Sequence, residues 1–326
     1  MRNSELLPNW SVTNRQLETE IVVAKHRLAE SGLFDDISLA RIIDAHPTAD
    51  LGVSTMGTDV TSPQDWRSGS AGSLSGEELL HAVRNGRLWL NLRRCVQNHP
   101  EIACLVREIY AELEEKTQGL RTFNYSANLL ISSPNAIVYY HMDCPVNMLW
   151  HLRGEKRVYA YPREEKFLPR KLTEDVIAGI APEEIPFDLA WDEEAFIRPL
   201  HAGEMITWPQ HSPHRVVNTN GLNVSLSTEH YTKTALRRNN VHMANRHFRQ
   251  WLPAFGRSDA MSGTVPAIKE MALRFCRRVP GLRPQEPNGY EYPKTFAVDL
   301  DAPQCIDVSD GTINNRSMPE EIACSV

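Results

Sequence analysis

The sequence predicts an α+β protein in which an all-β core, residues 120–232, lies between a helical region at 1–119 and another at 233–326. Before residue 120, apolar residues recur at spacings of three and four, which is typical of amphipathic helices. From about residue 120, short runs of β-branched and aromatic residues are separated by Pro, Gly and Asn, which is typical of strands and turns. After residue 232 the helical pattern returns. With 326 residues, 41% of them hydrophobic, the chain is long enough to bury a substantial core.

The first region is expected to pack its helices against the core. Helices are predicted at 14–30 and at 36–45, the second beginning at an aspartate that can cap it. Residues 47–75 are rich in Ser, Gly and Thr, and we interpret them as a flexible loop or a lid. Ser75 and Glu78 have the spacing of a capping box, which predicts the start of a short helix.

Further along the chain, Asn85 and Gly86 end this helix before a strand-like run, RLWLNLR, and another helix is predicted at about 100–117. Residues 163–198 interrupt the strands of the core and are interpreted as an insertion with a helix near TEDVIAGI. The tail at 285–326 shows no clear periodicity, and no role is predicted for it.

Composition excludes several classes of protein. No run of eighteen apolar residues predicts a membrane span, and the opening MRNSELLPNW does not resemble a signal peptide, so we expect a cytoplasmic protein. The cysteines show no CxxC pair or regular spacing, which argues against a disulfide framework and a structural zinc site. They are Cys95, Cys104, Cys144, Cys276, Cys305 and Cys324.

Charge is segregated along the chain. Residues 162–205 carry eleven acids against five bases, whereas residues 233–283 carry eleven Lys and Arg against two acids. The basic run RRNNVHMANRHFRQW is compatible with contact to nucleic acid or an anionic substrate. A solvated helix face or a subunit contact is the preferred interpretation, because such charge runs are common.

The stretch 139-YYHMDCPVNMLWHLRGEKRVYAYP-162 contains a candidate metal site. Residues two apart on a strand face the same side, so Tyr139, His141 and Asp143 are expected to point one way. An imidazole beside a carboxylate supplies two of the three protein ligands of a non-haem Fe(II) site. The alternative is a polar interruption in a buried sheet.

Lys156 follows His141 by fifteen residues. A β-turn at Arg153 and Gly154 would return the chain antiparallel to the preceding strand and direct Lys156 into the core. A buried ammonium needs an anionic partner, and the remote carboxylate of 2-oxoglutarate is a suitable one. The alternative is a surface lysine in a turn.

A second segment, 203-GEMITWPQHSPHRVVN-218, places Gly203, Pro209, His214 and Asn218 so that one strand ends at a proline turn and the next begins with an inward-facing histidine. Together the two segments resemble the JmjC-like, or cupin-like, branch of the Fe(II)/2-oxoglutarate-dependent oxygenases. The resemblance covers roughly residues 120–232. It implies a double-stranded β-helix, a jelly-roll barrel flanked by amino-terminal and carboxy-terminal helices.

The resemblance also implies roles for individual residues. His141, Asp143 and His214 would be the iron ligands, Lys156 would hold 2-oxoglutarate, and Asn147 would face this cosubstrate. Fe(II), 2-oxoglutarate and O2 are therefore the expected cofactor and cosubstrates, with succinate and CO2 as coproducts.

Two positions depart from the pattern of this family. Val138 stands where relatives often carry a hydroxyl for 2-oxoglutarate, so that contact would come from Tyr139, Tyr125 or Ser227. His211 stands where the second cupin motif has glycine, as a strained turn residue or a group near the metal.

Tentative substrate residues complete the predicted site. They are His211, Trp208 and His151, although Trp208 and His151 also fit the wall of the core. Cys144 is expected to face away from the metal.

Three functions are compatible with these residues. The first is a 2-oxoglutarate-dependent dioxygenase that hydroxylates an unactivated C–H bond, of a small molecule in preference to a protein or RNA residue. The second is a cupin enzyme that uses the metal without 2-oxoglutarate, and the third is a non-catalytic binding module. The carboxy-terminal helices could also pair two subunits as a homodimer.

Overall fold

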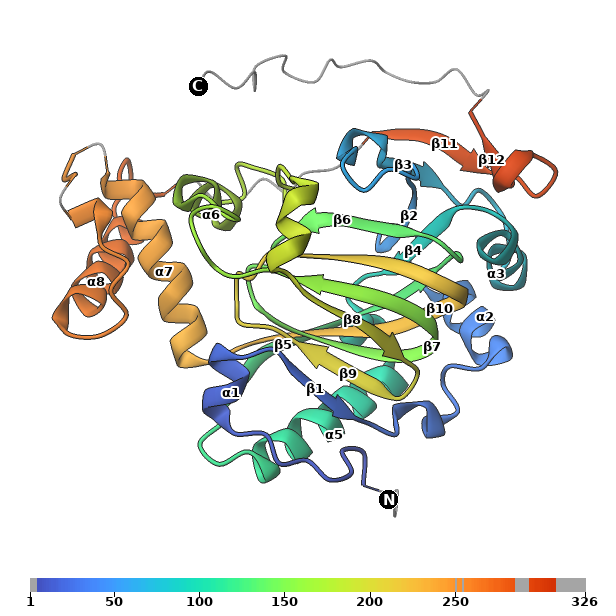
Figure 1. The fold of residues 1–326 in the computed structure, drawn as a ribbon, viewed down its shortest axis with the longest axis horizontal. Coiled ribbons are helices and arrows are strands. Elements are labelled where there is room, and N and C mark those ends of the chain that lie inside the picture. The colour runs from blue at the N-terminus through green and yellow to red at the C-terminus, as the bar shows by residue number, and fades with distance from the viewer. Residues whose placement is uncertain (1–4, 250, 254, 285–292, 309–326) are drawn as a thin grey trace.

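The computed structural model describes residues 5–249, 251–253, 255–284 and 293–308 (Figure 1). Its larger sheet has the strand order β1, β9, β7, β10, β5, β4, β2, β3, β11, β12. A smaller sheet has the order β6, β10, β7, β8, because β6 pairs with β10 and β8 pairs with β7. The strands are β1 (Val22–Lys25), β2 (Leu51–Thr55), β3 (Arg67–Ser70), β4 (Leu88–Leu92), β5 (Phe123–Ser132), β6 (Ile137–His141), β7 (Val146–Ala160), β8 (Phe196–His201), β9 (Glu204–Thr207), β10 (His214–Tyr231), β11 (Lys294–Val298) and β12 (Ile306–Asp307).

Strands β7 and β10 belong to both sheets. They pair antiparallel from His214 opposite Ala160 to His230 opposite Val146, with register shifts in the middle. Near these shifts Gly154 has φ +82° and Gly221 has φ +66°, values that glycine adopts without strain. The predicted β-turn at Arg153 and Gly154 is therefore wrong. The chain bends there and continues as one strand, because its hydrogen-bond partner is β10 on both sides of the bend.

The two sheets face each other. Leu149 and Ile206 of the larger sheet pack in one cluster with Val158, Leu200 and Val216 of the smaller sheet. The outer face of the larger sheet is covered by helices, and in β5 the buried Ala127, Leu129 and Ile131 alternate with residues that face the interior. This arrangement confirms the predicted double-stranded β-helix with helices around it.

The helices are α1 (Asn14–Thr19), α2 (Asp36–Ala45), α3 (Gly76–Asn85), α4 (Cys95–Asn98), α5 (Pro100–Lys116), α6 (Arg170–Ile177), α7 (Lys233–Phe248) and α8 (Thr264–Arg278). The capping box of Ser75 and Glu78 is confirmed at the start of α3. Helix α2 has the predicted bounds, with Asp35 as its cap. Figure 1 shows α5 below the larger sheet and α7 and α8 side by side at one end of the barrel.

Two predictions for the first region are wrong. The helix expected at 14–30 ends at Thr19, and β1 follows, because the β-branched run from Ile21 to Val23 pairs with β9. The loop expected at 47–75 contains β2 and β3, which extend the larger sheet. Its composition resembles that of a loop because β2 and β3 are short and rich in Gly, Ser and Thr.

Part of the carboxy-terminal region also forms strands. β11 pairs in parallel with β3, and β12 pairs with β11. The rest of the tail, 285–292 and 309–326, lies outside the described residues, as does Cys324. The other five cysteines are free thiols. Within the described ranges, no helix is long and apolar enough to cross a membrane.

The bend of β7 gives a testable prediction of stability. A Cβ on Gly154 would lie 2.7 Å from the carbonyl oxygen of Leu222, whereas a Cβ on Gly221 would meet nothing within 4 Å. Both substitutions place alanine at a positive φ, which costs about 1–2 kcal/mol. We expect Gly221→Ala to lose about that much and Gly154→Ala clearly more, measured as the free energy of unfolding in urea. Equal losses would contradict a close contact at Gly154.

Candidate metal centre

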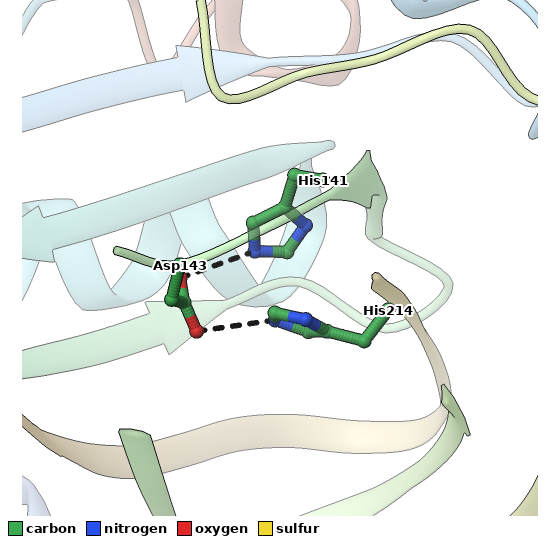
Figure 2. Close-up of side chains that lie close together, drawn as sticks. All are labelled: His141, Asp143 and His214. Atoms are coloured by element: carbon green, nitrogen blue, oxygen red, sulfur yellow. Dashed lines mark ion pairs between the residues drawn. The ribbon is translucent and has the colours of Figure 1, made fainter. Parts of the chain in front are cut away.

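Three side chains converge at one end of the barrel interior. His141 is the last residue of β6, His214 is the first residue of β10, and the two are paired across the strands. Asp143 comes from the segment between β6 and β7 (Figure 2). One ligand atom from each of the three lies within 4.8 Å of the others. The structure thus brings together the three residues for which the sequence predicts metal binding.

The backbone between His141 and Asp143 differs from the regular strand that the sequence predicts. Asp143 was expected on the same strand as His141, but β6 ends at His141. The pairing of β6 with β10 also shifts by one residue between Val138 and His141. Alternation along a regular strand therefore does not apply across this stretch.

Hydrogen bonds orient both imidazoles toward Asp143. His141 Nδ1 donates to the carbonyl oxygen of Tyr139 at 2.7 Å, and His214 Nδ1 donates to that of Ser212 at 3.1 Å. These bonds leave each Nε2 with its lone pair available, as a metal ligand requires. The His214 Nε2 lies 3.4 Å from Asp143 Oδ2, and the His141 Nε2 lies 3.9 Å from Asp143 Oδ1.

Asp143 carries the clearest sign that this site suits a cation. Its Oδ2 is buried and accepts no hydrogen bond from any described residue. Burial raises the pKa of Asp143, whereas His141 and a hydrogen bond from Asn147 lower it. Burial also lowers the pKa of His214 well below its usual value, so this imidazole is neutral. Two imidazoles and one carboxylate fit a divalent metal, and in particular Fe(II).

Lys156 lies in the same cavity, which has a volume of about 620 Å³. The side chain is almost completely buried, and its ammonium donates to Ser225 Oγ at 2.9 Å. No carboxylate of a described residue pairs with it. Burial lowers the pKa of Lys156 to about 7, because nothing anionic compensates for its desolvation. A cation enclosed in this way favours an anionic ligand.

Among the residues proposed to bind the cosubstrate, Asn147 and Ser227 line the cavity and are hydrogen bonded to each other at 3.0 Å. Tyr139 lines it too, but its hydroxyl accepts a hydrogen bond from the Gly57 backbone at 3.2 Å and so anchors the segment after β2. Tyr125 stacks on Tyr110 in the core under the helices. Among these candidates, Ser227 is the hydroxyl that the structure directs into the cavity.

The three predicted substrate residues do not lie together. Trp208 lies in the cavity wall with its ring 4.0 Å from that of His214. His151 is buried between Ser225 and Gly154, where it donates from Nε2 to the Gly154 carbonyl. It supports the Ser225 hydroxyl that contacts Lys156 and does not line the cavity.

His211 does not face the metal cavity. Its φ is +69°, as expected of a strained turn residue, and its Nε2 is hydrogen bonded to Oδ1 of Asn239 on α7 at 2.7 Å. The sulfur of Cys144 lies against α6 and also faces away from the metal ligands.

The sequence analysis missed two carboxylates of this cavity. Glu183, an exposed residue that lines the cavity, comes from the insertion, and its backbone carbonyl accepts a hydrogen bond from the Met142 backbone. Glu229 comes from β10. Burial, with the charge of Asp143 next, raises the pKa of Glu229 to about 7. Neither residue belongs to a local motif, because the insertion and β10 meet only in the folded chain.

A second cluster within the described residues, Glu174, His242 and Asp259, is close enough to hold a metal. Its carboxylates already have cationic partners, since Glu174 pairs with Arg249 and Asp259 pairs with Arg170. The cluster is therefore a weaker metal candidate than His141, Asp143 and His214.

No family model and no curated protein matches the chain. Solved structures that match include three of YcfD from Escherichia coli. One is 14% identical with a TM-score of 0.46, and the alignment covers 85% of this chain and 70% of YcfD.

A second structure is described as the ribosomal oxygenase YcfD in complex with cobalt and 2-oxoglutarate. It is 15% identical with a TM-score of 0.42, and the alignment covers 81% of this chain and 64% of that one. A third, also described as a ribosomal oxygenase, is 18% identical with a TM-score of 0.43 and covers 85% and 69%. At these identities and TM-scores the likenesses do not assign an activity to this chain.

The geometry of the three ligands predicts the outcome of removing them. We expect His141→Ala, Asp143→Ala and His214→Ala each to lower the affinity for Fe(II) by more than about 100-fold. Removal of a residue that only hydrogen bonds to a metal ligand typically lowers metal affinity by about 10- to 100-fold, and removal of a ligand should cost more. Anaerobic calorimetry with Fe(II) measures this effect. The control is His201→Ala, a histidine whose side chain is 53% exposed. If a ligand variant bound Fe(II) as tightly as the control, that residue would not be a ligand.

Proposed function

We propose that the chain is an Fe(II)/2-oxoglutarate-dependent dioxygenase that hydroxylates an unactivated C–H bond. The observation that carries this proposal is the buried cation of Lys156 in the same cavity as His141, Asp143 and His214. A metal site alone fits many cupin enzymes. A metal site beside an enclosed, unpaired ammonium is suited to a cosubstrate that chelates the metal at one end and carries a carboxylate at the other.

When bound, iron with 2-oxoglutarate supplies the oxidation: one oxygen atom of O2 enters succinate, the other enters the new hydroxyl group, and CO2 is released. The residues of the chain hold and orient the reactants. Lys156 would bind the remote carboxylate of 2-oxoglutarate, and Asn147 would hold Asp143 in place by a hydrogen bond. The hydroxyl of Ser227, which is hydrogen bonded to Asn147, would make the contact to 2-oxoglutarate that Val138 cannot make. Trp208 would shield one face of His214 from water.

Two other functions remain alternatives. A cupin enzyme that does not use 2-oxoglutarate leaves the burial of Lys156 unexplained, and a non-catalytic module leaves the unpartnered Asp143 Oδ2 unexplained. Anaerobic Fe(II) titration with and without 2-oxoglutarate separates the three. A weak visible charge-transfer band that requires both would support the proposal. Unchanged 2-oxoglutarate after prolonged incubation with Fe(II), O2 and cell extract would contradict it.

The sequence analysis favours a small molecule, but no observation on the described residues prefers it to a residue of protein or RNA. YcfD is described as a ribosomal oxygenase, so ribosomes belong among the substrates tested. Mass spectrometry of cell extract incubated with Fe(II), 2-oxoglutarate and ¹⁸O2 would identify the product directly. The cytoplasmic location and the homodimer also stay predictions.

Lys156→Met is expected to raise the KM for 2-oxoglutarate by at least about tenfold, because it removes a charge-assisted hydrogen bond in a buried site. The matched control is Lys25→Met, which changes a lysine whose side chain is 67% exposed. Steady-state assays of succinate formation measure both variants. An unchanged KM in Lys156→Met would exclude Lys156 as the carboxylate anchor.

The pH dependence of cosubstrate binding follows from the same lysine. Because burial lowers the pKa of Lys156 to about 7, its ammonium is present below pH 7 and is lost above it. The dissociation constant of 2-oxoglutarate is therefore expected to rise about tenfold between pH 6 and pH 8. Calorimetry with the Fe(II)-loaded protein at both pH values measures the change. The dependence should disappear in Lys156→Met, and its persistence there would assign it to another group.

A further inference from the structure

Helix α8 packs on the rest of the described chain with one side. Leu273 and Cys276 from this side lie in one apolar cluster with Ala244 and Phe248 of α7. In Figure 1, α8 lies at the outer end of the molecule, and α7 separates it from the barrel. The other side of α8 is therefore available for contact with another molecule.

An apolar stripe runs along this exposed side. The α8 stripe consists of Val265, Ile268, Met271 and Phe275, whose exposed fractions are 37%, 47%, 66% and 62%. Spacings of three and four residues place these side chains on one side of the helix. Isolated exposed apolar residues are ordinary, but a row of them over about three helical turns is typical of an interaction surface.

The charges beside the α8 stripe are positive. Arg274, Arg277 and Arg278 are exposed, and within the described ranges none of them forms an ion pair. The partly buried Glu270 of the same helix is already paired with Arg237 of α7. These like charges limit how two copies of the helix can meet.

The α8 stripe is complementary to itself when two copies of α8 meet antiparallel. Met271 is the midpoint of the helix (Thr264–Arg278), with Ile268 three residues before it and Phe275 four residues after it. A twofold axis at Met271 would therefore place Met271 against its own copy and Ile268 against Phe275 of the second copy. Such reciprocal contacts are what a twofold interface requires.

The antiparallel arrangement also keeps the arginines apart. At about 1.5 Å of rise per residue, Arg277 and Arg278 would lie roughly 18–21 Å along the helices from their own copies, and Arg274 about 9 Å. Charges at such separations are largely screened, because the screening length in physiological salt is about 8 Å. A parallel pair would instead set the same arginines side by side.

The exposed area is close to what a dimer needs. Large apolar side chains have about 150–200 Å² of surface each, so the exposed fractions of the α8 stripe amount to roughly 300–400 Å² per copy. The stems of the flanking arginines extend this area toward the roughly 600 Å² per partner of the smaller specific interfaces.

We propose that the α8 stripe is the interface of a homodimer in which two copies of α8 pack antiparallel around Met271. The interface does not depend on iron or on 2-oxoglutarate. Because α7 lies between α8 and the barrel in each copy, the two barrels lie on opposite sides of the paired helices.

Sedimentation equilibrium of the full chain tests the interface. Between about 0.1 and 100 μM, the mass is expected to rise from the 37.0 kDa of one chain toward twice that value. Met271→Asp sets two like charges against each other at the twofold axis, so it should raise the dissociation constant of the dimer at least about 100-fold. Far-ultraviolet circular dichroism verifies that the variant is folded.

The matched control is Ile37→Asp. Ile37 lies on α2 and is 84% exposed, outside the proposed interface, so its variant should dimerise within about twofold of the parent. A mixture of Met271→Asp with Met271→Lys should associate more tightly than either variant alone, because opposite charges then meet at the axis.

Three results would overturn the proposal. The first is a parent protein that keeps the mass of one chain at every concentration, including one that floats with vesicles of phosphatidylglycerol and phosphatidylcholine, which would assign the α8 stripe to a lipid surface. The second is a dimer that Met271→Asp leaves intact. The third is a mixture of the aspartate and lysine variants that associates no better than its components.

Discussion

The antiparallel pairing of β7 with β10 is the constraint on which the rest of the structure depends. It runs from His214 opposite Ala160 to His230 opposite Val146 and passes through both sheets. The same pair therefore closes the barrel, places His214 beside β6 and carries Lys156 into the interior. Only a bent pair can do this, and the left-handed φ values of Gly154 and Gly221 allow the bend.

Uncompensated charge distinguishes the interior from an ordinary core. Asp143 and Lys156 are both buried, yet they have no ion pair with each other among the described contacts, and the pKa of each is shifted toward its neutral form. Such groups cost stability in the free protein. A divalent cation bound by Asp143 would compensate for its negative charge, and a carboxylate bound by Lys156 would compensate for its positive charge. The buried charges and the candidate ligands therefore both favour a metal together with a cosubstrate that carries a carboxylate.

The loop from Pro209 to Ser212 links the candidate ligand His214 to α7. The Ser212 carbonyl of this loop accepts a hydrogen bond from His214, and His211 of the same loop is hydrogen bonded to Asn239 on α7. Gln210 connects this loop to α7 and to the residue after Asp143. Helix α7 is therefore part of the frame that holds the candidate metal ligands.

From the sequence alone, the strands of the central core, several helices and the residues that converge in the interior could be predicted. Periodicity and capping are local, so the capping box at Ser75 and the strand-rich core could be predicted from neighbouring residues. Motif spacing, together with the family resemblance, likewise pointed to His141, Asp143, His214 and Lys156 as candidates. The tertiary structure alone decided what depends on pairing between distant segments. The irregular pairing that ends β6 at His141 and the continuous bend at Gly154 both arise from contacts that no short stretch of sequence specifies.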